Sequence, residues 1–142
     1  ELKLKEFILN VLLNPKNNKI LGYFNRTLPN YRIPLQQVME ENYMHNLSLG
    51  EYAKISCRSL ASFKREFIDL YHITPGKWLI QKKLEHAKLL LDSTEKTISE
   101  IVFESGFENN SHFSRVFKDR FRLSPNFYRK KYLSKFYLNT EL

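Results

Sequence analysis

Aromatic side chains recur at helical spacing in two stretches of the chain, about fifty residues apart. They are Phe63, Phe67 and Tyr71 in the first stretch, and Phe113, Phe117 and Phe121 in the second. Because residues i and i+4 lie on one face of a helix, each set predicts a helix with a buried aromatic face. Thr74-Pro75 follows the first stretch and Ser124-Pro125 the second, which is typical of an N-cap and the first residue of another helix.

The repeat extends upstream of the aromatic helices. Ser48 with Glu51, and Thr97 with Glu100, have the spacing of capping boxes, so each pair predicts the start of a short helix. The turn before the second aromatic helix is one residue longer than the turn before the first. Each copy therefore predicts a short helix, a tight turn and a second amphipathic helix. This is a helix-turn-helix motif, present twice in one small chain.

The rest of the pattern completes an all-α fold. We expect seven main helices, over residues 35–44, 49–55, 59–70, 75–91, 98–104, 111–121 and 125–136. The first helix-turn-helix spans 49–70 and the second spans 98–121, with 75–91 as the long linker helix between them. Upstream, apolar residues at helical spacing end at Pro15 and predict a short helical N-terminal segment.

Composition and charge indicate which kind of partner the chain binds. The 142 residues carry a formal net charge of +8 and a pI near 9.6, which indicates an anionic partner, most simply nucleic acid, with an anionic membrane as the alternative. Residues 1–33 hold six basic and two acidic side chains, whereas residues 34–96 are nearly neutral. No apolar run approaches the length of a membrane span. A single cysteine, Cys57, cannot form an intrachain disulfide, so we expect a reducing, cytoplasmic location.

The sequence offers no catalytic set. His45, His72, His86 and His112 lack the spacing of zinc ligands, and Cys57 has no sign of an activating partner. A Gly-rich phosphate loop is also missing. We therefore expect no enzyme activity, no metal and no cofactor.

Residues 106–129 carry the most specific motif of the chain. Gly106-Phe107 is followed by His112-Phe113-Ser114-Arg115, by Phe117-Lys118 and, after Phe121, by a Ser-Pro pair and Tyr128-Arg129. This run resembles the signature of the AraC/XylS family of bacterial transcription factors, and residues 59–75 resemble the weaker first half of the family pattern. The resemblance covers about residues 35–134. It implies a DNA-binding domain over 34–142 and a transcription regulator that is more often an activator.

Two residues depart from the family pattern. Cys57 stands where a turn glycine is usual, and Arg122 stands where a glycine commonly follows the aromatic helix. If the first position needs a positive φ, a residue other than glycine is strained there. We therefore expect the turn at Cys57 to differ locally from the turn at Gly106.

The exposed N-terminal halves of the two recognition helices supply the candidate DNA contacts. They are Ser59, Ala61, Ser62, Lys64 and Arg65 in the first copy, and Asn109, Asn110, Ser111, His112 and Arg115 in the second. The resemblance aligns Ala61, Lys64, Arg65 and Arg115 with base-reading positions of similar proteins. Lys118 and Arg129 are better suited to phosphate contacts.

For several of these residues a second interpretation stays open. Ala61 can offer only an apolar contact, such as one with a thymine methyl, whereas Lys64 and the arginines could bind guanine. Lys64 could instead contact phosphate or only solvent. His112 could be a structural histidine beside Phe113, and Arg129 could form a salt bridge to the body of the domain.

The sequence as a whole predicts a regulator that inserts two non-identical helices into adjacent major grooves of double-stranded DNA and presents a surface to RNA polymerase. Residues 1–33 are expected to be the end of a regulatory domain that is absent from this chain, plus a linker, or else a helix that packs on the main body or binds a partner. An effector or a dimer contact would belong to that absent domain. The alternative function is a basic helical module that binds an acidic protein or a membrane surface.

Overall fold

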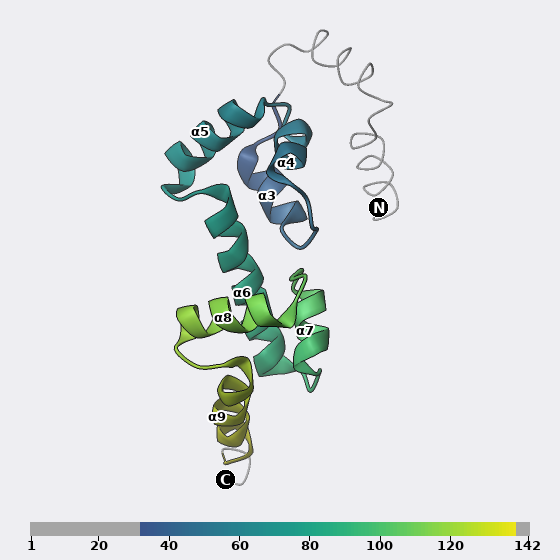
Figure 1. The fold of residues 1–142 in the computed structure, drawn as a ribbon, viewed down its shortest axis with the longest axis vertical. Helices are drawn as coiled ribbons and strands as arrows, with labels where there is room; N and C mark the ends of the chain where they lie inside the picture. The colour runs from purple at the N-terminus through teal and green to yellow at the C-terminus, as the bar shows by residue number, and fades with distance from the viewer. Residues whose placement is uncertain (1–31, 139–142) are drawn as a thin grey trace. The chain divides into compact units, whose positions relative to one another are not determined.

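The computed structural model describes residues 32–138, with side chains as far as residue 132. Within these residues the chain forms helices and no strand, as Figure 1 shows. The helices are α3 (Leu35–Asn42), α4 (Leu49–Ile55), α5 (Leu60–Tyr71), α6 (Pro75–Ser93), α7 (Ile98–Glu104), α8 (Asn110–Phe121) and α9 (Pro125–Leu138). The predicted all-α class is confirmed, while the predicted N-terminal helical segment falls outside the described residues, save for its last two.

The chain divides into two compact units, Glu1–Trp78 and Leu79–Leu142, and the boundary falls within α6. In the first unit α4 packs on α3 and α5, and in the second unit α8 packs on α7 and α9 (Figure 1). Each unit therefore contains one helix-turn-helix motif together with a supporting helix.

Side-chain caps determine where the helices of both motifs begin. The hydroxyl of Ser48 accepts a hydrogen bond from the backbone N–H of Glu51 at 3.3 Å, and the Glu51 carboxylate accepts one from the Ser48 N–H at 2.6 Å. Thr97 and Glu100 repeat this arrangement at 3.3 and 2.7 Å. Both predicted capping boxes are confirmed, and the hydrogen bonds hold the pKa of each glutamate below its usual value.

At α3, α5 and α8 a local polar group lies where the helix bound differs from the expected one. α5 begins at Leu60 because Ser59 is its N-cap, and α8 begins one residue earlier than expected because Asn109 is its N-cap. α3 ends at Asn42, whose buried amide donates back to the Val38 carbonyl at 2.8 Å. α6 and α9 each run two residues beyond the predicted end.

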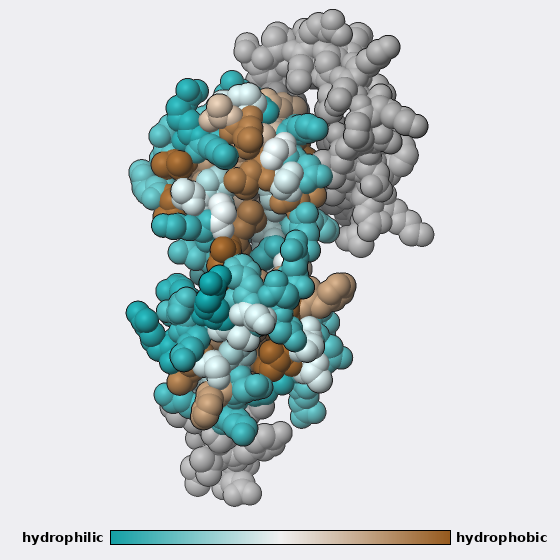
Figure 2. Space-filling view, in the orientation of Figure 1, coloured by the Kyte–Doolittle hydropathy of each residue, from teal (hydrophilic) through white to brown (hydrophobic). Residues whose placement is uncertain are grey.

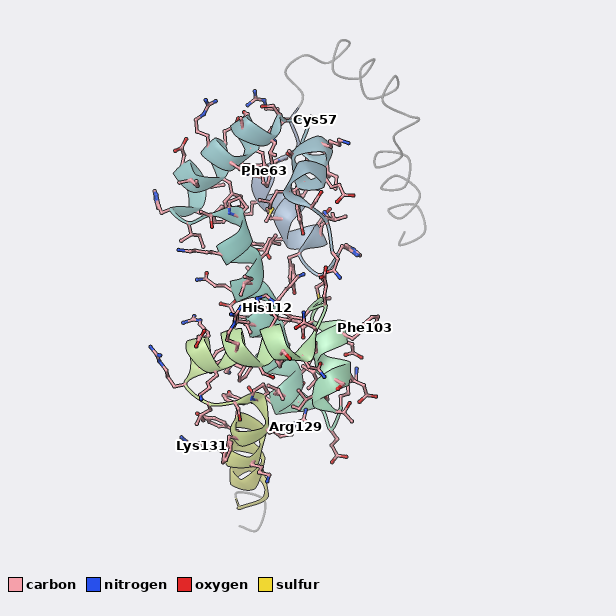
Figure 3. The ribbon with its side chains drawn as sticks, in the orientation of Figure 1. Cys57, Phe63, Phe103, His112, Arg129 and Lys131 are labelled. Carbon is pink, nitrogen blue, oxygen red and sulfur yellow. The ribbon has the colours of Figure 1, made fainter. Side chains whose placement is uncertain are left out.

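The core of the first unit is built from aromatic rings. Tyr52 of α4 and Phe63 and Phe67 of α5 are fully buried, and Phe63 points from α5 into the unit (Figure 3). The Phe67 ring lies 4.5 Å from the Tyr71 ring and 6.1 Å from the Trp78 ring. The repeated aromatic spacing therefore packs one face of α5, as predicted from the sequence.

The second unit has a similar aromatic core. Phe113 and Phe117 of α8 are fully buried, and the Phe117 ring lies 4.5 Å from Phe121 and 5.5 Å from Tyr128. Phe107, from the turn, packs at 5.1 Å against Phe113. The apolar face of α6 adds Leu84, Ala87 and Leu91 to the same core.

The two motif turns begin with the same backbone hydrogen bonds, although the second turn is one residue longer. In the first, the N–H groups of Cys57 and Arg58 donate to the carbonyls of Lys54 and Ala53 at 3.0 and 2.8 Å. In the second, the N–H groups of Gly106 and Phe107 donate to the carbonyls of Phe103 and Val102, both at 3.0 Å. Both turns pass through the left-handed region, with φ of 56° at Cys57 and 75° at Gly106.

The expectation that the Cys57 turn would differ is therefore wrong. The cysteine adopts the left-handed conformation that the turn requires, at a cost of roughly 1–2 kcal/mol for a residue with a Cβ. His72 and Arg122 do the same at the C-caps of α5 and α8, with φ of 57° and 63°. The fold requires these conformations at matching positions in both motifs, whichever residue is present.

Candidate nucleic-acid interface

The exposed face of α5 presents three of the predicted site residues. Ala61, Lys64 and Arg65 are all exposed, and their i, i+3, i+4 spacing places them together on the face opposite the buried Phe63 and Phe67. The ammonium group of Lys64, the guanidinium of Arg65 and the methyl group of Ala61 therefore lie on a single exposed stripe of the helix.

The two serines predicted in the first copy serve the helix itself. The Ser59 hydroxyl accepts a hydrogen bond from the Ser62 N–H at 3.2 Å, which makes Ser59 the N-cap. The Ser62 hydroxyl donates to the Glu66 carboxylate at 2.6 Å and is half-buried. Both side chains therefore fix the start of α5.

In the second copy, α8 brings three exposed residues together. Ser111, Arg115 and Lys118 follow one another at i, i+4 and i+7, so they line one face of α8. The asparagines are engaged elsewhere: the Asn109 Oδ1 caps α8 by accepting from the His112 N–H at 2.8 Å, and the Asn110 Nδ2 donates to the Ser99 hydroxyl of α7 at 3.0 Å.

His112 has a structural contact. It is half-buried on α8 (labelled in Figure 3), and its ring packs edge to face against the Phe107 ring, with the ring centroids 5.9 Å apart. Of the two interpretations of this residue, the packing favours the structural histidine.

Arg129 is less exposed than the other predicted phosphate contact, Lys118. It is half-buried on α9 (Figure 3), and its Nε and Nη2 atoms are buried and bond to no atom of the described residues. The next two residues, Lys130 and Lys131, are exposed on the same helix. Lys130 and Lys131 are more exposed than Arg129, so they suit a phosphate contact better.

A charged cluster that the sequence reasoning missed lies at the base of the first motif. The Glu66 carboxylate of α5 receives Arg58 Nε at 2.9 Å and Arg32 Nη1 at 2.7 Å. The Arg58 side chain is only 8% exposed, and its Nη1 also donates to the carbonyls of Ile33 and Ser56 at 2.8 and 2.6 Å. This cluster connects the start of the described chain to the first recognition helix.

Hydrogen bonding sets the ionisation of this cluster. The Ser62 hydroxyl and then Arg58 stabilise the charged form of Glu66 and lower its pKa to about 2. The signal in the sequence was a paired exchange: Arg58 matches Phe107 of the second copy, and Glu66 matches Val116. Two apolar positions that become opposite charges together indicate an ion pair.

The second motif is fastened to its unit by a lysine of α6. The Lys83 Nζ donates to the Gly106 carbonyl of the turn at 2.7 Å, and burial lowers the pKa of Lys83. Lys83 therefore holds the turn between α7 and α8 from the side of the linker helix.

Figure 2 shows hydrophilic residues over much of the visible face of each unit, with hydrophobic residues scattered among them. Within residues 32–138 there is no group of three His, Cys, Asp or Glu side chains that could hold a metal ion. In that same part of the chain, none of the helices has the length and apolar composition needed to cross a membrane.

Known proteins share the sequence pattern of these two motifs. A helix-turn-helix domain family matches residues 52–131. The virulence regulon transcriptional activator VirF of Yersinia enterocolitica is 27% identical over 126 residues, 89% of this chain and 46% of the relative. The transcriptional regulator ExsA of Pseudomonas aeruginosa is 24% identical over 125 residues, 88% and 45%. The chain thus spans a little under half the length of these relatives.

Solved structures share the fold. The DNA-binding domain of AdpA, solved in complex with a target DNA, is 25% identical with a TM-score of 0.69, and the match covers 72% of this chain and 95% of that one. The C-terminal domain of the response regulator yesN from Fusobacterium nucleatum is 31% identical with a TM-score of 0.63, covering 67% and 93%.

Two capped helix-turn-helix motifs with matching turns and a shared linker helix define a DNA-binding domain of the bacterial regulator type. The family match and these likenesses place it more closely: the chain belongs to the AraC-type helix-turn-helix family of transcription regulators. The family resemblance inferred from residues 106–129 is thereby confirmed.

Proposed function

We propose that this chain binds double-stranded DNA sequence-specifically, with α5 and α8 as recognition helices in adjacent major grooves, and that it regulates transcription. One observation carries this most directly: Arg65 and Arg115 stand exposed at matching positions of two helices that are capped and packed in the same way. The likeness to the AdpA domain, which was solved with its DNA, supports the same use of the fold.

The residues divide between base reading and positioning. Arg65 and Arg115 suit bidentate hydrogen bonding to guanine O6 and N7, and Lys64 suits the same edge. Lys118 lies further along α8, where it suits a phosphate contact that adds affinity without specificity. Ser59 and Asn109 act as caps, so they orient the helix starts instead of reading bases.

The wider role follows from the relatives. We infer a cytoplasmic, non-enzymatic activator that contacts RNA polymerase, because VirF is named a transcriptional activator and the chain resembles about half of it. Residues 34–142 would be the DNA-binding domain, and residues 1–33 the end of a regulatory domain plus linker. An effector or dimer contact would reside in that regulatory domain.

The test is a selection from a random 30-bp duplex pool, followed by titration of the selected duplex at several salt concentrations. We expect enrichment of one site and a preference for it over heparin, because base contacts add to the salt-dependent phosphate term. Lys118→Ala should weaken all duplexes about equally and reduce the salt slope by about 1. Equal binding to heparin and to selected DNA would favour the module that binds acidic partners.

A further inference from the structure

The first turn of α5 presents two apolar side chains where α8 presents two polar ones. Leu60 is 42% exposed and Ala61 is exposed, and they stand directly after the N-cap Ser59. The matching residues of the second copy are Asn110 and Ser111. Because the N-terminal residues of a recognition helix reach the base edges, this difference falls at the part of the helix that faces DNA.

Leu60 lacks the polar side chain that its counterpart uses. Its counterpart Asn110 is held by a hydrogen bond to Ser99 of α7 at 3.0 Å. In the first copy the position of Ser99 is taken by Gly50, and a Cβ built there would have only the Ser48 hydroxyl within 4 Å. The position that binds Asn110 in the second copy therefore has no side chain in the first, and Leu60 is 42% exposed.

In the major groove, thymine is the base that presents an apolar group, its C5-methyl. We propose, on the basis of the proposed function above, that Leu60 and Ala61 form a thymine-methyl contact site. The half-site that contacts α5 then requires thymine at one or two positions. The half-site that contacts α8 is recognised by hydrogen bonds and does not depend on thymine methyls. The two recognition helices thus differ in the chemistry of their readout.

The size of the effect follows from the burial of one methyl group. A buried CH₂-sized group contributes about 0.8 kcal/mol, and 1.4 kcal/mol is tenfold in affinity. Each methyl that packs against Leu60 or Ala61 therefore changes affinity about fourfold. Replacing thymine by deoxyuridine removes this methyl and leaves the hydrogen-bonding edge unchanged.

The experiment uses the 142-residue chain and the duplex that it selects from a random pool. Each thymine of that duplex is replaced singly by deoxyuridine, and the affinity is measured. We expect a loss of about fourfold at one or two thymines, all within one half-site. Leu60→Asn, which copies the second motif, should abolish the loss at one or more of them.

A matched control is available on the same helix. Ile68 is 43% exposed, as much as Leu60, but lies in the C-terminal half of α5, away from the base edges. Ile68→Ala should retain the full sensitivity to deoxyuridine. Arg115→Ala should also retain it while weakening the other half-site.

The outcomes separate this inference from the proposed function. A pool that yields no enriched duplex contradicts sequence-specific binding itself. An enriched duplex whose affinity is unchanged by every deoxyuridine overturns the methyl site and leaves the proposed function standing. Methyl sensitivity that survives Leu60→Asn unaltered, or that is lost in Ile68→Ala, also overturns the assignment to the first turn of α5.

Discussion

The two helix-turn-helix motifs share one arrangement of helices but are stabilised by different chemistry. Both have a capping box, a left-handed turn and an aromatic face, and both end in a left-handed C-cap. At the base of the recognition helix, however, the first motif has Arg58 paired with Glu66, where the second has Phe107 and Val116. Neighbouring polar or apolar groups can therefore support the same turn, provided that both members of the pair change together.

This difference also changes what each motif is connected to. The arginine of the first motif reaches the Ile33 carbonyl and shares Glu66 with Arg32, so α5 is tied to the segment that precedes α3. The second motif is instead fastened to α6, through Lys83 and the shared apolar core. A change in the position of Arg32 or Ile33 would therefore act on the first motif directly, because both residues contact its charged cluster.

The largest expected effect concerns what the motifs have in common. Phe67→Ala and Phe117→Ala each remove a fully buried ring, so each should lower the free energy of unfolding by about 3–5 kcal/mol. Urea unfolding checks this, followed by the fluorescence of Trp78 for the first unit and by far-UV circular dichroism for the helices of both units together. Phe127→Ala, at an exposed position, is the control and should stay within about 0.5 kcal/mol of wild type.

A shared architecture of aromatic cores would be contradicted if one of the two buried phenylalanines behaved like Phe127. In that case the corresponding motif would owe its stability to contacts other than its ring stack.

The next largest effect concerns the ion pair that only the first motif has. Glu66→Val leaves the mostly buried Arg58 without its carboxylate and should lower the free energy of unfolding by roughly 1–3 kcal/mol. The double variant Arg58→Phe with Glu66→Val copies the second motif and should recover at least half of this loss, because a packed apolar pair can replace a buried ion pair. A double variant as unstable as the sum of its single changes would show that the motifs are not interchangeable at these positions.

The charged cluster also makes the first motif sensitive to acid. The folded pKa of Glu66, about 2, lies below its unfolded value, so its stabilising contribution is present above the unfolded pKa and is lost as pH falls towards 2. Between pH 5 and pH 3 the wild type should lose more unfolding free energy than Glu66→Gln. The capping-box glutamates are common to both proteins, so their contribution cancels. Parallel pH profiles for the two proteins would rule out the assigned pKa shift.

The smallest effect concerns the turns. Cys57→Gly relieves the strain of a positive φ but makes the unfolded chain more flexible, so it should stabilise the protein by less than about 1 kcal/mol. Gly106→Ala introduces the strain that Cys57 already tolerates and should cost roughly 1–2 kcal/mol. Thermal unfolding of both variants measures the difference. A Cys57→Gly variant that is less stable than wild type, or a Gly106→Ala variant that is as stable as wild type, would mean that the two turns are not equivalent.

Local signals in the sequence were enough to predict most of the fold. Capping boxes and Ser/Thr-Pro pairs act within four residues, so the starts of α4, α6, α7 and α9 were predicted correctly. The end of α3 was missed, since besides the local Asn42 bond it carries a tertiary contact, in which the Tyr52 hydroxyl of α4 donates to the Asn42 carbonyl at 2.8 Å. The Cys57 turn was misjudged because a general preference for glycine was weighed without the hydrogen bonds that hold the turn.

The candidate site was harder to predict from the sequence. Whether a polar side chain faces DNA or bonds within the domain depends on the residues that lie next to it in the fold. Ser59 and Asn109 proved to be caps, and Asn110 is bonded to α7. His112 packs on a ring, and two nitrogens of Arg129 are buried. The positions that remain open are those on the exposed stripes of α5 and α8, which helical spacing alone could locate. Their roles in DNA reading stay predictions.

The central claim is that the two motifs read different half-sites of one duplex. Footprinting of the chain on its selected duplex tests it most directly, with Arg65→Ala and Arg115→Ala compared at equal concentration. Each change should cost about 1–3 kcal/mol of specific binding at its own base pair. We predict that Arg65→Ala loses protection chiefly over one half-site and Arg115→Ala chiefly over the other. Variants that lose protection over both half-sites equally, or over neither, would contradict the assignment of one recognition helix to each half-site.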